Sequence, residues 1–115
     1  MDKKLKKLLR DARVGLTALA ILKLLVDNGS MHGYGIRKML SILMDWDPPE
    51  TSVYDALKRL EKLGLARSYW ARGKRGVPRK YYEPTQIAEK ILNEALDELG
   101  GLFGWLICRR RGESD

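Results

Sequence analysis

The sequence predicts a mainly helical α+β fold, with a β-hairpin between three helices and a long C-terminal helix. Apolar residues recur at helical spacing up to residue 60, and the period becomes that of strands between residues 65 and 83. Helical spacing returns from residue 85 onward. The 115 residues, 44% hydrophobic and 32% charged, are enough for one domain with a modest core.

The first 28 residues predict two helical segments. Residues 1–13 form a basic amphipathic arm or helix, in which leucines fall on one side among lysines and Arg10. This segment either packs against the protein or remains a solubilising arm. Residues 14–28 are apolar almost all round, which indicates a buried helix, and Asn28-Gly29 ends it because both residues accept the left-handed conformation.

Two shorter helices are expected next, over residues 34–44 and from Ser52 to Gly64, with a Pro-Pro pair in the loop between them. Ser52 suits the N-cap of the later helix, and Asp55 three residues on completes a capping-box pattern. The apolar spacing gives this helix one buried face and one polar face.

A β-hairpin with a long basic tip follows. Residues 65–70 and 80–83 are expected to be its strands, and residues 71–79 contain two glycines, a proline and no acid. Like charges repel on so small a tip, so the hairpin is expected to contact phosphate; a solvated loop is the alternative. The cations between residues 67 and 80, again without an acid, are Arg67, Arg72, Lys74, Arg75, Arg79 and Lys80.

Residues 85–108 predict a long helix with the apolar seam of a coiled coil. Such a seam needs a partner, and a second copy of the chain is the simplest one. We therefore expect a homodimer, with a charged tail over residues 109–115 after the dimerisation helix. The seam residues, spaced by 4, 3, 4, 3 and 4 positions, are Ala88, Leu92, Ala95, Leu99, Leu102 and Leu106.

The order of these elements indicates a winged helix-turn-helix domain over residues 14–84. In that arrangement the third helix enters the DNA major groove and the hairpin, or wing, lies along the neighbouring backbone. A net charge of +7 agrees with double-stranded DNA as the partner. The candidate DNA contacts are Thr51, Ser52, Tyr54, Lys58 and Arg59 in the helix, and Arg72, Lys74, Arg75, Arg79 and Lys80 in the hairpin.

Three motifs together resemble the PadR family of transcriptional regulators. They are HGYGI at residues 32–36, SVYDALKRLE at residues 52–61 and GVPRKYY at residues 76–82, and they occur in the family's order and spacing. The resemblance covers residues 14–90. The single C-terminal helix is similar to that of the short branch of the family.

The resemblance implies a dimer that binds a palindromic operator, usually as a repressor that an effector or stress signal releases. It also implies that Tyr54 faces DNA and that Arg79 and Lys80 place the wing. The chain departs from the family pattern where Asp55, and not proline, follows this tyrosine. The departure bears on the operator sequence and not on the fold.

The end of the long helix carries a candidate effector site. Some short members of the family hold flat aromatic ligands between tryptophans at the dimer interface. By that resemblance, Phe103 and Trp105 are candidates for binding a small aromatic effector; plain packing in the dimer is the interpretation that we favour. Cys108 either forms an intersubunit disulfide or is a spectator thiol.

An enzyme is not expected. The one histidine and the one cysteine lie 76 positions apart, so no catalytic pair and no metal site is evident, and no cofactor is expected. His32 is interpreted as a residue that starts a helix and bonds to the backbone. Asp45, Asp47 and Glu50 are interpreted as a solvated acidic turn and not as a cation site.

Two other binding functions stay open: a sequence-nonspecific architectural nucleic-acid-binding protein, and a winged helix used only for protein contacts. An RNA-binding platform is not indicated, because Tyr81 and Tyr82 fall on opposite faces of one strand. Neither a signal peptide nor a membrane span is evident, since Lys23 interrupts the longest nearly apolar stretch, residues 14–26. We expect a cytoplasmic protein.

Overall fold

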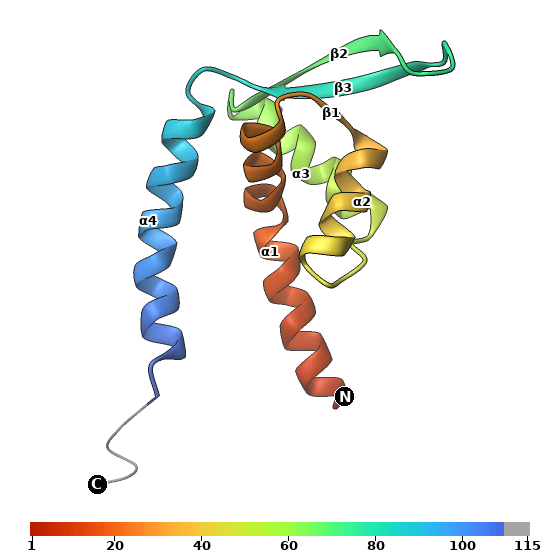
Figure 1. Cartoon of the computed structure of the whole chain (residues 1–115). Coiled ribbons are helices and arrows are strands. Elements are labelled where there is room, and N and C mark those ends of the chain that lie inside the picture. The colour runs from red at the N-terminus through yellow and green to blue at the C-terminus, as the bar shows by residue number, and fades with distance from the viewer. Residues whose placement is uncertain (110–115) are drawn as a thin grey trace, which may run out of the picture.

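The computed structural model describes residues 1–109 and has the predicted α+β architecture (Figure 1). The residues predicted as a charged tail lie outside this range from position 110 onward. The elements, in chain order, are α1 (Lys3–Asn28), β1 (Met31–His32), α2 (Gly33–Leu43), α3 (Glu50–Lys62), β2 (Ala66–Arg72), β3 (Pro78–Pro84) and α4 (Ala88–Ile107).

Helix α1 is one continuous helix of 26 residues, where the sequence suggested two segments. The Asp2 carboxylate accepts a hydrogen bond from the Lys4 N–H at 2.6 Å and so caps its start. Gly29, at a φ of 85°, ends it as expected. All buried residues of α1 lie from Thr17 onward, so its basic N-terminal half is helical but extends away from the core (Figure 1).

The start of α3 differs from the prediction. The helix begins at Glu50 with Pro49 as N-cap, and no side chain caps it. Ser52 is therefore already helical, and the predicted capping box of Ser52 and Asp55 is wrong. The Pro49 carbonyl already accepts a helical hydrogen bond from the Val53 N–H at 3.3 Å, so the helix starts at the pair of prolines, earlier than the Ser signal suggests.

The sheet has three antiparallel strands in the order β1-β3-β2. β1 was not predicted, because two residues carry no periodicity; Met31 pairs with Tyr82, and His32 with Tyr81. β2 and β3 pair from Ala66 opposite Pro84 to the end of the hairpin, so both strands are longer than expected. The turn shrinks to residues 73–77, and most of the wing cations stand on paired strands and not on a loop. We call β2, β3 and this turn the wing.

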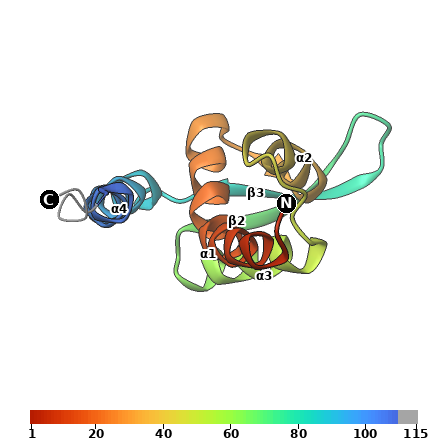
Figure 2. The same ribbon diagram turned by 90° about the horizontal axis from the view of Figure 1, so that it is seen from below.

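The core lies where α1, α2 and α3 pack beneath the sheet, and the first turns of α4 complete it. Ala88 and Leu92 are 0% and 3% exposed within the single chain. These two seam residues are thus covered by their own domain, which departs from the expectation that they contact a second copy. Figure 2 shows that α4 and the turn of the wing lie at opposite ends of the molecule.

Candidate nucleic-acid interface

Helix α3 presents the polar face that the sequence predicted. Val53, Leu57 and Leu60 hold it on the core, at 0–3% exposure. The Arg37 Nε donates to the Pro48 carbonyl at 3.1 Å, which ties the preceding loop to α2. On the opposite side, Ser52 is half-buried, and the exposed residues are Thr51, Tyr54, Asp55, Lys58, Arg59 and Lys62.

A glycine positions Tyr54. Gly33 is buried at the start of α2, and a Cβ added there would lie 2.7 Å from the Tyr54 hydroxyl oxygen. The Tyr54 ring therefore rests against the backbone of α2, and only glycine leaves room for it. This contact joins residues that are distant in the sequence, so sequence reasoning missed the role of Gly33.

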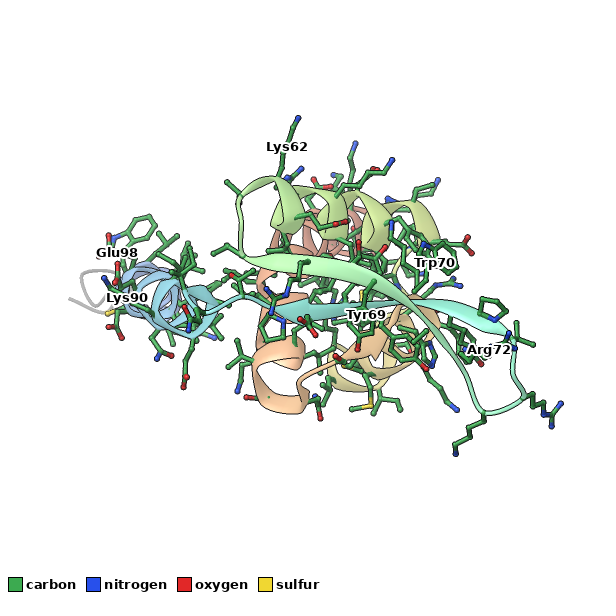
Figure 3. All side chains as sticks on the ribbon, turned by 90° about the horizontal axis from the view of Figure 1, so that it is seen from above. Lys62, Tyr69, Trp70, Arg72, Lys90 and Glu98 are labelled. Carbon is green, nitrogen blue, oxygen red and sulfur yellow. The ribbon has the colours of Figure 1, made fainter. Side chains whose placement is uncertain are left out.

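The wing presents two different faces. Trp70 pairs with Lys80, and these side chains share the face of Tyr82, which is buried against the helices. Tyr69 pairs with Tyr81 on the other face, where their rings stack with centroids 5.8 Å apart. The sticks of Figure 3 show Trp70 on the α3 side of β2.

Most of the wing cations have no carboxylate partner among the described residues. Arg67 pairs with Glu83 across the strands. Within residues 1–109, the ion pairs include none of the other wing cations, and none of the α3 cations. The Arg72 Nη1 instead donates to the Gly76 carbonyl at 3.2 Å, which braces the turn. The wing cations left without a carboxylate are Arg72, Lys74, Arg75, Arg79 and Lys80.

Two clefts connect the start of α2 to the wing. The larger, about 570 Å³, lies between Tyr34 and Lys38 on α2 and Lys74 and Arg75 on the turn. The smaller, about 370 Å³, reaches from Tyr34 past Tyr54 to the wing strands. Among the described residues, no Asp or Glu lines either cleft. Sequence reasoning missed Tyr34 and Lys38, because their place on α2 carries no separate signal.

His32 joins the clefts to the backbone of α2. Its Nδ1 accepts a hydrogen bond from the Gly35 N–H at 3.1 Å, which confirms its predicted structural role at the helix start. Burial lowers the pKa of His32, and the Arg79 guanidinium, with Nη1 3.4 Å from the ring nitrogens, lowers it further. The ring is therefore neutral near pH 7, as a hydrogen-bond acceptor must be.

The α4 candidates do not join this surface. Ala95 and Leu99 are half-buried, whereas Leu102 and Leu106 are 48% and 55% exposed. Phe103 and Trp105 are 41% and 71% exposed and line none of the main clefts of residues 1–109. Figure 3 shows Lys90 and Glu98 on α4 at the end of the molecule opposite Arg72 of the wing. Ile91 and Leu96 are also exposed, at 37% and 42%, and exposed apolar side chains become more numerous in the C-terminal half of α4.

No metal or membrane feature is found in the part of the chain that the structure describes. Its His, Cys, Asp and Glu side chains form no group that could hold a metal ion. Glu50 of the acidic turn lies 3.8 Å from Arg37. None of the helices within residues 1–109 is long and apolar enough to cross a membrane.

Comparison with known proteins identifies the family. The model of the transcriptional regulator PadR-like family matches residues 21–94. The chain belongs to the PadR-like family. The resemblance carried by the three sequence motifs is confirmed, and the protein is a transcriptional regulator and not an enzyme. A comparison with curated protein sequences gave no match.

Solved structures share the fold of this PadR-like regulator. A PadR family transcriptional regulator from Eggerthella lenta is 26% identical, with a TM-score of 0.79 over 91% of this chain and 90% of the other. A transcriptional regulator from Clostridium thermocellum is 27% identical, with a TM-score of 0.70 over 92% and 94% of the two chains. PadR from Bacillus subtilis, solved in complex with operator DNA, is 23% identical, with a TM-score of 0.57 over 81% and 48%.

Proposed function

We propose that this PadR-like regulator is a homodimer that binds a palindromic operator through α3 and the wing, and that it acts as a repressor. The observation that carries the proposal is the row of wing cations that no carboxylate neutralises within residues 1–109. A fixed array of like charges on a paired hairpin repels itself unless an anion lies against it, and duplex DNA supplies regularly spaced phosphates.

The two parts of the proposed interface, α3 and the wing, have different roles. The first turns of α3, with Thr51 and Tyr54, are proposed to reach base edges in the major groove, because both side chains are exposed at the start of the helix. Lys58 and Arg59 follow on the exposed side of the same helix and are proposed to hold the phosphate backbone. The wing, with Lys74 and Arg75 at its turn, is proposed to hold the neighbouring stretch of backbone.

A second copy of the chain is proposed to cover the C-terminal half of α4. Between 48% and 71% of the surface of Leu102, Leu106 and Trp105 is exposed. Exposed apolar side chains gathered on one surface are typical of an interaction site. The acidic residues of α4 and its distance from the wing suit a dimer contact away from DNA (Figure 2). A two-fold axis near α4 presents two copies of α3 to the two halves of a palindrome.

An effector site at this dimer contact is part of the proposal. Phe103 and Trp105 offer aromatic faces close to the proposed two-fold axis, where two copies of each would meet. A planar aromatic molecule stacked between them is proposed to relieve repression. Quenching of tryptophan fluorescence by planar aromatic compounds, lost in Trp105→Ala, tests this part; quenching that survives the substitution places the ligand elsewhere.

Fluorescence anisotropy tests the DNA-binding proposal. The protein is titrated into labelled DNA from upstream of its own gene, and into a scrambled duplex, at low and near-physiological salt. We expect a slope of log K against log salt of about −0.9 for each phosphate contacted, and a preference for the native DNA of about a thousandfold. Steep salt dependence without preference would favour an architectural protein. No binding to either duplex would favour a protein-contact role.

A further inference from the structure

Trp70 is exposed in a place that the fold does not explain. It stands in the middle of the paired part of β2, yet 69% of its surface is open to solvent. Tyr82, on the same face of the neighbouring strand, is only 4% exposed because α3 and the core cover it. From Tyr82 toward the turn, the hairpin extends past the helices. The face of the strands that carries Trp70 is therefore not covered by the helices there.

The residues around Trp70 indicate the chemistry of a ligand that could cover it. The indole lines the smaller cleft together with Tyr54 and Lys80, and Lys80 stands directly opposite it on β3. One side of this cleft is thus formed by the start of α2 together with Tyr54 of the proposed base-reading helix, and the other side by the wing. Within residues 1–109 no acid lines the cleft, so its occupant is an anion with apolar surface beside the charge.

The sugar–phosphate backbone of DNA has this chemistry. A phosphate oxygen only accepts hydrogen bonds, and an indole N–H only donates them. A deoxyribose ring has apolar faces on which a flat aromatic side chain can pack. The indole also loses little conformational freedom on binding, because only two χ angles hold it.

We propose that Trp70 packs on a deoxyribose of bound DNA, with its Nε1–H donating to the adjoining phosphate, and so links α3 to the wing along one strand. The inference rests on the proposed function, since it needs a duplex held between α3 and the wing. It adds a contact that carries no charge. Its contribution is therefore independent of salt, unlike that of the cation across the strand.

Matched substitutions at the two paired positions separate this role from a structural one. Trp70→Ala is expected to weaken binding to native and scrambled duplex alike, by about tenfold, with the salt slope unchanged. Lys80→Ala is expected to lower the slope by about 0.9. Trp70→Phe keeps a ring without the N–H and is expected to fall between Trp70→Ala and the parent. A Trp70→Ala protein that binds as tightly as the parent overturns the proposal.

Fluorine NMR on 5-fluorotryptophan-labelled protein reports the contact directly. The chain has three tryptophans, and each signal is assigned with its own Trp→Phe variant. Saturation with scrambled duplex is expected to remove the H₂O/D₂O solvent shift of the Trp70 signal and to leave that of Trp105 unchanged. Anisotropy on the same samples shows whether DNA is bound. A bound duplex with the Trp70 solvent shift intact overturns this inference alone, whereas no binding by the parent overturns the proposed function and this inference with it.

Discussion

Replacing Gly33 by alanine tests how Tyr54 is held at the proposed interface. The added Cβ would lie 2.7 Å from the Tyr54 hydroxyl oxygen and 3.2 Å from Cε1 and Cζ of the ring. Carbon and oxygen atoms do not approach so closely without repulsion, so the ring must move. The atom that meets the methyl group is the end of a side chain that is 42% exposed, and it can swing outward without disturbing the core.

Stability and DNA affinity are therefore expected to respond differently to Gly33→Ala. The free energy of unfolding is expected to change by less than about 1 kcal/mol, because alanine has the higher helix propensity and the displaced ring is partly solvated. Operator affinity is expected to fall about tenfold, or about 1.4 kcal/mol, since Tyr54 is displaced from its place beside α2. Urea unfolding measures the first quantity, and fluorescence anisotropy with the native upstream DNA measures the second.

A double-mutant cycle decides whether the loss passes through Tyr54. In a Tyr54→Ala background the added methyl group has no ring to displace, so Gly33→Ala is expected to cause no further loss. Tyr54→Ala itself is expected to weaken binding to the operator more than to scrambled duplex. The reasoning is refuted if Gly33→Ala binds the operator as tightly as the parent, or if it weakens binding equally when Tyr54 is absent.

Three further predictions concern pH, salt and the two halves of α4. The pKa of His32 is lowered by burial and by a neighbouring guanidinium, so as the pH falls below about 6.5 the unfolded chain binds the proton first and stability is lost. As the pH is lowered, the urea midpoint of His32→Asn should fall less than that of the parent protein. An equal fall in both proteins would contradict the assigned role of neutral His32 at the start of α2. Lys74→Ala and Arg75→Ala should weaken binding to all duplexes and each lower the salt slope by about 0.9 in anisotropy titrations; an unchanged slope would exclude phosphate contact. Leu92→Ala should destabilise the folded chain by about 2–5 kcal/mol, because Leu92 is buried, whereas Leu106→Glu should leave it folded but monomeric in analytical ultracentrifugation. A dimeric Leu106→Glu protein would place the contact elsewhere.

Elements with several turns of regular spacing were predictable, and short or long-range features were not. The inward faces of α1 and α3 follow from helical periodicity, because apolar burial dominates folding. β1 exists only because Met31 meets Tyr82, which lies 51 positions along the chain. The Ser52 cap failed for a local reason, since the Ser signal competes with the prolines that precede it. A sequence pattern shows which local structures a segment can form, and contacts with the rest of the fold determine which of them it adopts.

The apolar seam of α4 also shows that a local pattern does not identify its tertiary contacts. A heptad pattern reports an apolar face without naming what covers it. The first two seam residues, Ala88 and Leu92, are covered by the core of their own chain, and the free face begins only beyond them. The charged members of the proposed DNA interface could be picked out from the sequence, because Lys and Arg side chains suit phosphate contacts. Trp70 was not, because alternation alone places it on the buried face of β2.

The arrangement of the two ends of the molecule gives the proposed regulation a simple mechanism. α4 and the turn of the wing lie at opposite ends of the fold, so a dimer joined through α4 sets the distance between its two α3 helices by the angle at which the copies meet (Figure 2). Operator binding requires this distance to match the repeat of the duplex, about 34 Å or a multiple of it. In this proposal, a ligand that wedges between the α4 ends changes the angle, and the resulting displacement grows with distance from α4, through α3 to the turn of the wing. Release from DNA then needs no rearrangement inside either winged-helix domain, only a dimer whose two copies no longer fit one operator.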